Sequence, residues 1–228
     1  MVLFDYSDGR NKEVPKALLK DFKGYLQTDG YKAYDSLDNK PEITQLNCMA
    51  HARRKFENAL NYDRQKAEHA LIMFQKLYAT ERKAREKEMS YQQRHTLRLE
   101  ESLPVLNELG KWITDNYQIA PPKSLIGEAM AYCIPRWDKL MAYLKDGALE
   151  IDNNPAENAI RPIALGRKNY LFAGSTRGAH RAAMIYSFMA TCKKHDVNPF
   201  EWLKKVLEII PDYKASRLHE LLPQNLKL

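Results

Sequence analysis

A long tract of helical character, from His51 to about Tyr117, restricts how this chain can fold more than any other feature. Its composition is dominated by Lys, Arg, Glu and Gln, as in "RQKAEHALIMFQKLYATERKAREKE", and the helix breakers in and after it are Pro104 and the pair Pro121-Pro122. The residues before this tract have the pattern of short strands instead. The sequence therefore predicts an all-helical insertion in a domain that also contains a sheet.

The first fifty residues contain three strand-like runs. The run "VLFDY" has the length and aromatic content of a buried strand, and "SDGR" after it is a turn. A strand is also predicted in "GYLQTDGY", ending at Asp29-Gly30, and another in "ITQLNCMA". Between the first two runs, Val14, Leu18 and Phe22 recur every four residues, which predicts a helix.

The residues after the helical tract are also predicted to be mainly helical. Residues 124–145 form an amphipathic helix interrupted near Pro135, and "GALEIDNN" is extended or turn-like. Residues 177–194 and 199–210 are two further amphipathic helices. The apolar face of the last helix contains four residues: Phe200, Leu203, Leu207 and Ile210.

Positive charge is concentrated in one part of the chain. The sequence has 36 Lys and Arg against 29 Asp and Glu, a formal net charge of +7. Residues 158–195 contain seven basic side chains and no acidic one, so the remainder is balanced. The seven are Arg161, Arg167, Lys168, Arg177, Arg181, Lys193 and Lys194. This distribution favours an anionic partner, nucleic acid or a membrane surface.

The cysteine content and the hydropathy pattern indicate the cellular compartment. The three cysteines, with no C-x-x-C pair, argue against a disulfide framework and fit a reducing cytoplasm. No apolar run approaches the roughly 18 residues that span a bilayer, and the first residues lack a signal-peptide pattern. We therefore expect a cytoplasmic protein without a membrane segment.

Two carboxylates stand where functional residues are often found, and each also has a structural interpretation. Asp29 follows a predicted strand, where α/β sheets place functional groups, but Asp-Gly is also a common turn. Glu157 would close a capping box with Asn154, or pair with Arg161 one turn later. Each of these interactions contributes only about 0.3 to 1 kcal/mol, and neither explains the acid-free basic run that follows.

A metal-dependent reaction on DNA explains the acids and the basic run together. A divalent ion needs oxygen ligands, and DNA phosphates need Lys and Arg. Two-metal phosphodiester chemistry brings carboxylates from separated parts of the chain to ions about 3.5 to 4 Å apart. The long interval between Asp29 and Glu157 is compatible with this chemistry if the helical tract is an insertion.

Several long motifs resemble, in this order, those of the insertion sequence 66 family of transposases. They are "GYLQTDGYKAYDSL", "CMAHARRKF", "IDNNPAENAIRPIALGRKNYLFAGS", "RAAMIYS" and "LLPQNLKL". The resemblance covers essentially the whole chain. It implies a ribonuclease-H-like core of the DDE type, interrupted by an insertion before the last acid. It also implies a reaction dependent on Mg²⁺ (or Mn²⁺) that cuts transposon ends and joins them to target DNA.

The family motifs place the second catalytic acid at Asp29 and the third at Glu157, both as metal ligands. The positions matched in "HARRKF" are His51, Arg53 and Arg54, and those in "IDNN" are Asp152, Asn153 and Asn154. With these matches, the predicted DNA-binding residues are Arg53, Arg54, Arg161, Arg167, Lys168, Arg177 and Arg181.

Two positions near these motifs have simpler interpretations. His51 at a helix start is more often a hydrogen-bonded structural residue than a catalyst. Cys48 and His51 form a C-x-x-H pair, but the other ligands of a structural zinc site are missing.

The family's first catalytic Asp and its N-terminal DNA-binding region are expected upstream of "VLFDY", and Asp5 is a weak substitute for that Asp.

The sequence thus predicts an α/β fold, a truncated ribonuclease-H-like core with a large helical insertion, mostly helical by residue count. The predicted parts are 1–50 (start of the core), 51–145 (insertion), 146–195 (completion of the core with the Glu157 helix) and 196–228 (helical extension). The predicted function is that of a transposase fragment, inactive alone, that self-associates or pairs with an upstream transposase region. The alternatives are a catalytically silent DNA-binding or regulatory remnant and, more weakly, a helical scaffold with an incidental basic face.

Overall fold

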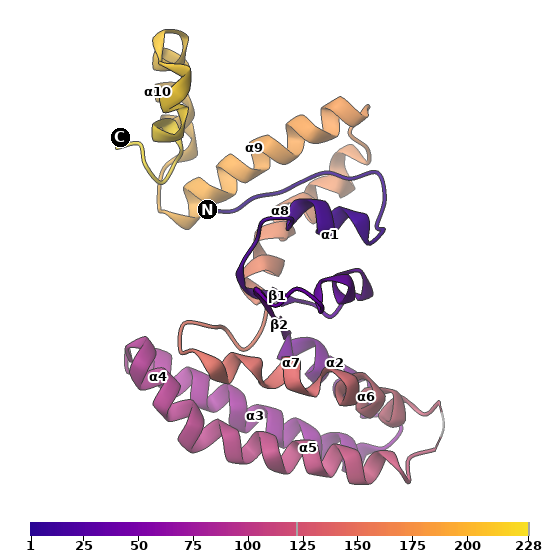
Figure 1. The fold of residues 1–228 in the computed structure, drawn as a ribbon. Helices are drawn as coiled ribbons and strands as arrows, with labels where there is room; N and C mark the ends of the chain where they lie inside the picture. Colours follow the sequence, from indigo (N-terminus) through magenta and orange to yellow (C-terminus); the bar gives the residue numbers. More distant parts are fainter. Residues whose placement is uncertain (122, 228) are drawn as a thin grey trace. The chain divides into compact units, whose positions relative to one another are not determined.

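A computed structural model describes residues 1–121 and 123–227, so Pro122, one of the expected helix breakers, and Leu228 lie outside the described residues. The fold is mostly helical, with a small parallel sheet of two strands (Figure 1). The chain divides into two compact units. The scaffold unit, as we call it, is Asn11–Asn154, and the basic unit is Met1–Arg10 together with Pro155–Leu228.

The sheet of the scaffold unit consists of β1 (Gly24–Thr28) and β2 (Ile43–Asn47), which confirms two of the three predicted strands. The strands pair in parallel, from Gly24 opposite Ile43 to Thr28 opposite Asn47. A 3-10 helix, η1 (Lys32–Leu37), lies in the crossover between them. At the carboxyl ends, the buried Asn47 side chain donates a hydrogen bond to Thr28 Oγ1 at 3.2 Å, so both strands end at one edge.

Helices make up most of the scaffold unit and confirm the helical pattern predicted from His51 onward. In chain order they are α1 (Glu13–Leu18), α2 (Met49–Ala59), α3 (Arg64–Glu86), α4 (Tyr91–Leu97), the π-helical turn η2 (Arg98–Ser102), α5 (Leu103–Tyr117), α6 (Leu125–Cys133), η3 (Ile134–Arg136), α7 (Trp137–Met141) and η4 (Ala142–Lys145). The expected interruption near Pro135 is the short 3-10 helix η3 between α6 and α7. Local signals set the boundaries: Asp63 caps α3, and Ser90 with Gln93 forms a capping box at α4.

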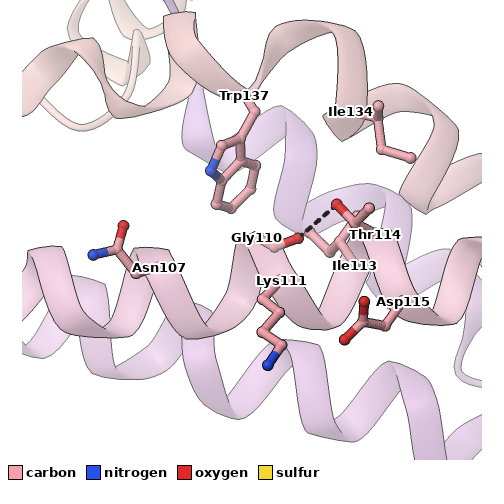
Figure 2. A pocket seen from close by; sticks show the side chains of 8 residues that line it. All are labelled: Asn107, Gly110, Lys111, Ile113, Thr114, Asp115, Ile134 and Trp137. Atoms are coloured by element: carbon pink, nitrogen blue, oxygen red, sulfur yellow. Dashed lines mark hydrogen bonds between the residues drawn. The ribbon is translucent and has the colours of Figure 1, made fainter.

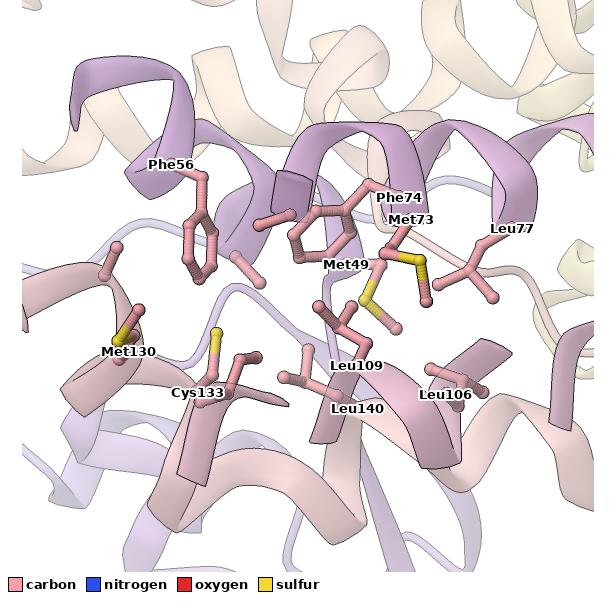
Figure 3. Packing of buried hydrophobic residues seen from close by; sticks show 14 of the residues in the cluster. Met49, Phe56, Met73, Phe74, Leu77, Leu106, Leu109, Met130, Cys133 and Leu140 are labelled. Atoms are coloured by element: carbon pink, nitrogen blue, oxygen red, sulfur yellow. The ribbon is translucent and has the colours of Figure 1, made fainter. Parts of the chain in front are cut away.

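The core of the scaffold unit lies among α2, α3, α5 and α6 (Figure 3). Phe56 of α2 and Phe74 of α3 are fully buried, with ring centroids 5.6 Å apart. Leu109 of α5 and Cys133 of α6 are also fully buried in this cluster. Burial of such side chains stabilises each by about 1.5 to 3 kcal/mol relative to exposure.

A charged network is buried beside this core. Arg98 is fully buried and donates from Nε and Nη2 to the two carboxylate oxygens of Glu81, at 2.7 and 2.8 Å. Arg94 links Glu81 to Glu150 with hydrogen bonds of 2.6 to 3.0 Å. Arg98 also donates to three main-chain carbonyl oxygens, those of Tyr143, Asp146 and Leu149. The network therefore holds the chain that leads from η4 toward Ile151.

The basic unit consists mainly of helices α8 (Asn154–Tyr170, which begins at the last residue of the scaffold unit), α9 (Thr176–Lys194) and α10 (Pro199–Ile209). Two 3-10 helices follow, η5 (Ile210–Asp212) and η6 (Ala215–Leu221). Its core is small and centred on Trp202, whose ring lies 5.1 Å from that of Phe188. The indole N–H of Trp202 donates to the carbonyl oxygen of Leu221 at 2.9 Å, which holds η6 to α10.

The prediction that "VLFDY" is a buried strand was wrong. Residues 2–6 form no strand, and Leu3 is exposed. The amides of Val2 and Phe4 donate instead to the hydroxyl oxygens of Thr191 and Ser187 on α9, at 3.0 and 2.8 Å. A strand needs another strand's carbonyls and amides, and here helix side chains satisfy those groups.

Two predicted apolar faces differ from the observed ones. The helix expected through Phe22 ends at Leu18, which is exposed. In α10 the buried residues are Trp202 and Val206, whereas the predicted face of Phe200, Leu203, Leu207 and Ile210 is exposed. The large indole and its hydrogen bond to Leu221 decide which side of α10 faces the core.

Candidate catalytic carboxylates and nucleic-acid interface

Asp29 directly follows β1, at the carboxyl edge of the sheet, and its side chain is exposed. One carboxylate oxygen, Oδ1, accepts a hydrogen bond from the amide of Tyr31 at 2.9 Å. Gly30 has φ +83°, a conformation that glycine adopts readily and that gives the sharp exit expected from the sequence. The other oxygen, Oδ2, accepts no hydrogen bond that the described residues donate, so it is available to a ligand.

The main chain at Asp29 is fixed by the end of α6 and by η3. The hydroxyl of Tyr132 donates to the carbonyl oxygen of Asp29 at 3.1 Å, and Arg136 Nη2 donates to that of Gly30 at 3.5 Å. Burial raises the pKa of Tyr132 to about 12, so its phenol is protonated and donates at neutral pH. Neither residue carries a sequence signal for this role, because more than a hundred positions separate each from the loop that it holds.

Glu157 lies in the first turn of α8 and is partly buried. The positive end of the helix dipole favours a carboxylate at this place. Asp29 belongs to the scaffold unit and Glu157 to the basic unit. Their convergence on a shared metal stays a prediction, as does the capping role of Glu157.

The two carboxylates fit a hard divalent cation by chemistry, since Mg²⁺ and Mn²⁺ prefer oxygen ligands and Mg²⁺ is often held by only one or two carboxylates. The uncommitted Oδ2 of Asp29 is the observation that supports this fit. Among the described residues, no group of three or more His, Cys, Asp or Glu side chains is placed to hold a metal ion.

Asp152, in the "IDNN" motif, is engaged in structural contacts. It is 7% exposed and accepts hydrogen bonds from the Tyr78 hydroxyl at 3.0 Å and from the side-chain and main-chain nitrogens of Asn154 at 2.9 and 3.0 Å. The amide of Asn153 donates to Cys48 Sγ at 3.4 Å. Burial raises the pKa of Tyr78 and of the Cys48 thiol, so both stay protonated. The motif thus anchors the chain beside β2, just before α8 begins.

The predicted DNA-binding residues on α8 and α9 are exposed, namely Arg161, Arg167, Lys168, Arg177 and Arg181. Within the ranges that the structure describes, none of them forms an ion pair. Arg54 of α2 is likewise exposed without an ion pair to a described carboxylate, whereas Arg53 pairs with Glu57 at 2.7 Å. His51 lies half-buried on the same helix.

The spacing along α8 relates the carboxylate to the cations. At about 3.6 residues per turn, positions four and eleven residues after Glu157 lie on the same side of the helix as Glu157 itself. Those positions are Arg161 and Lys168. One face of α8 therefore carries an acid at its start and two cations after it.

The Asp29 side chain lines neither of two hollows in the scaffold unit. One has a volume of about 380 Å³ and lies beside α5, η3 and α7, where the Trp137 indole faces Gly110 (Figure 2). A second, of about 620 Å³, is lined by side chains of α2 and α3, including Arg53, Tyr78 and Arg82.

No described helix has the length and apolar character to cross a membrane.

Comparison with protein families identifies a transposase. Residues 1–181 match the model of the "Transposase IS66 family", and residues 187–224 match the "IS66 C-terminal element". Because the first match covers most of the chain, the chain belongs to the IS66 family of transposases, as the sequence motifs predicted.

Three curated relatives come from Sinorhizobium fredii (strain NBRC 101917 / NGR234), and each is called an uncharacterized protein. The protein y4hP is 35% identical over 95% of this chain and 42% of its own length. The proteins y4qI and y4jD are 35% and 31% identical, over 43% and 45% of their lengths. The chain thus spans less than half the length of these relatives. No solved structure matches it.

Proposed function

We propose that this chain is the later part of a DDE transposase that cuts transposon ends and joins them to target DNA. The observation that carries this proposal is Asp29, held at the carboxyl end of β1 with Oδ2 uncommitted, in a chain of the IS66 family. The sheet would belong to a ribonuclease-H-like core formed by residues 1–50 and 146–195, with 51–145 as insertion and 196–228 as extension.

In this proposal Asp29 and Glu157 hold Mg²⁺ or Mn²⁺. Bound there, the divalent ions supply activation of the attacking oxygen and stabilisation of the leaving oxygen. The Asx turn at Tyr31 keeps Asp29 Oδ1 oriented, and Glu157 lies in the first turn of α8. Asp5, exposed on the segment beside α9, stays a weak substitute for the first acid of the family.

The DNA backbone would lie on the exposed cations of α8 and α9, with Arg53 and Arg54 of α2 as further contacts. Except for Arg53, which pairs with Glu57, these cations form no ion pair with a described carboxylate, so they release no protein partner when they bind phosphate. The partners are transposon ends and target DNA, and the chain self-associates or joins an upstream transposase region.

DNA binding is tested by replacing Arg167 and Lys168 together with Ala. The salt slope of duplex binding should fall by about 1.8, since each phosphate contact contributes about 0.9, and affinity should weaken for every sequence. The matched control replaces Arg64 and Lys66, which already pair with Glu68 and Asp63 at 2.6 and 2.9 Å. Equal slopes for both double variants would place the interface elsewhere.

Catalysis is tested by strand cleavage of supercoiled DNA that carries transposon ends, with Mg²⁺ or Mn²⁺. We compare this chain, its Glu157→Gln variant and a version extended upstream to the length of the relatives. We expect activity only in the extended protein, because two carboxylates hold a two-metal site poorly. Cleavage by the short chain that disappears in Glu157→Gln would contradict inactivity and promote Asp5 to ligand.

A silent DNA-binding remnant is the second candidate function, and the seven basic side chains of residues 158–195, a range without acidic residues, favour it. In that case the extended protein would bind DNA with the same salt slope and would not cleave it. The two assays therefore separate the two functions.

A further inference from the structure

The helical part of the scaffold unit reaches back to the strand end that carries Asp29. Tyr132, near the end of α6, and Arg136, the last residue of η3, are the residues that make this connection. Their donors meet the carbonyl oxygens of two successive residues, Asp29 and Gly30. The contact therefore fixes the main chain at Asp29 and leaves its side chain exposed.

The two side chains also fix each other. The guanidinium carbon of Arg136 lies 4.5 Å from the centre of the Tyr132 ring, and Arg136 Nη1 donates to the Tyr132 carbonyl oxygen at 3.1 Å. Lys55 of α2 lies on the same ring at 5.7 Å. Cation–π contacts of this kind stabilise each partner's position. These contacts therefore hold the ring and hydroxyl of Tyr132 in place independently of its hydrogen bond to Asp29.

Gly30 shows how closely this pair approaches the loop. A Cβ atom at position 30 would lie 2.9 Å from the Tyr132 hydroxyl oxygen and 3.2 Å from Arg136 Nε. The positive φ of Gly30 also disfavours any other residue there. The glycine after the aspartate thus serves the contact with Tyr132 and Arg136 as well as the turn.

The base of this contact is rigid. Met130 and Cys133, on either side of Tyr132 along the chain, are fully buried in the core of the scaffold unit. A hydroxyl attached to such a core holds its acceptor at a defined place, whereas the strand end by itself is exposed.

We propose that Tyr132 and Arg136 are positioning residues that orient Asp29 for metal binding, so that the helical insertion supports the catalytic aspartate. This inference rests on the proposed function for the role of Asp29. It assigns to the insertion a task inside the site, in addition to any contact with DNA.

The test is Tyr132→Phe, which removes the hydroxyl and keeps the ring that Arg136 and Lys55 contact. Tyr62→Phe is the matched control, because Tyr62 is 77% exposed and its hydroxyl has no described hydrogen-bond partner. In the full chain, hydrogen exchange of the Tyr31 amide, which donates to Asp29 Oδ1, should become about threefold to tenfold faster in Tyr132→Phe alone. Unchanged exchange would overturn the inference.

Titration with MnCl₂, followed by paramagnetic broadening of the amides of residues 29–31, supplies the readout that a merely structural role would not move. Half-maximal broadening should need about threefold to tenfold more Mn²⁺ in Tyr132→Phe than in the wild type and the control. Equal titrations would overturn the positioning role. Absence of broadening at these residues in the wild type would instead refute Asp29 as a ligand, and the exchange result would still decide whether Tyr132 holds the loop.

Discussion

In the scaffold unit two buried charged side chains form an ion pair, whereas in the basic unit no described charged side chain is buried. Arg98 is fully buried against Glu81, and Arg94 joins Glu81 to Glu150. On α8, no described side chain is buried, and the cations of α8 and α9 form no ion pair with described carboxylates. Charge thus contributes to internal cohesion in one unit and is available to an outside ligand in the other.

The two units also differ in how many apolar side chains they bury. The core of the scaffold unit extends over β2, α2, α3, α5, α6 and α7, and the residues that line it are mostly fully buried. The basic unit buries Cys192, Trp202, Val206 and Leu221, and leaves Phe200 and Leu207 of α10 exposed. Since stability follows buried apolar area, the scaffold unit should unfold last and the basic unit should open first.

The largest effect that would sharpen this contrast is expected from Arg98→Ala. It leaves Glu81 buried with only Arg94 as a cationic partner and frees three carbonyl oxygens, so the scaffold unit should lose about 3 to 5 kcal/mol. The measurement is denaturant unfolding combined with hydrogen exchange of α3 and α5. Arg64→Ala, which removes an exposed pair with Glu68, is the control at about 0 to 1 kcal/mol. Equal losses in both variants would contradict the contrast.

A smaller loss of stability is expected when the pH is lowered. Burial opposes ionisation of Glu81, but hydrogen bonds from Arg98 and Arg94 outweigh it and lower the pKa of Glu81 below its usual value. A carboxylate whose folded-state pKa is lowered contributes stability that is complete above its unfolded pKa of about 4.3. That contribution is lost as the pH falls through the lower folded-state value.

The free energy of unfolding of the scaffold unit should therefore fall below about pH 4 more steeply in the wild type than in Glu81→Gln, which has no carboxylate to protonate at this position. Denaturant titrations from neutral to acidic pH measure the two slopes. Parallel curves would mean that the network adds no pH-dependent stability, and that charge does not distinguish the units in this way.

The sequence predicted those parts of the fold that local pattern decides. Hydrophobic periodicity and composition predict both strands of the sheet and the helices after His51. The proline predicts the break near Pro135. Residues 2–6 were misassigned because their apolar composition suits a strand, while the hydroxyls that satisfy their amides lie nearly two hundred residues away. Distant partners of this kind leave no trace in a local pattern.

The residues of the candidate site can likewise be separated into those that local sequence signals predict and those that depend on distant contacts. The place of Asp29 after β1 and of Glu157 at the start of α8 could be predicted from strand and helix signals. The residues that hold their surroundings, Tyr132 at Asp29 and Tyr78 at Asp152, could not. Both tyrosines lie on helices of the scaffold unit, α3 and α6, where an aromatic residue at helical spacing is indistinguishable from an ordinary packing residue.

The smallest effect concerns the basic unit alone and is expected from Trp202→Phe. The change keeps an aromatic ring against Phe188 but removes the N–H that donates to Leu221 O, and leaves that buried carbonyl without its partner. We expect a loss of about 1 to 2 kcal/mol, seen as faster hydrogen exchange in α9, α10 and η6. Trp112→Phe on α5 is the matched control, because the Trp112 indole stacks on His69 at 4.7 Å and its N–H has no described acceptor. Its effect should be confined to the scaffold unit and should be smaller. If Trp202→Phe also accelerated exchange in α3 and α5, the two units would open as one cooperative body, and the division between a cohesive scaffold and a separately opening basic unit would be wrong.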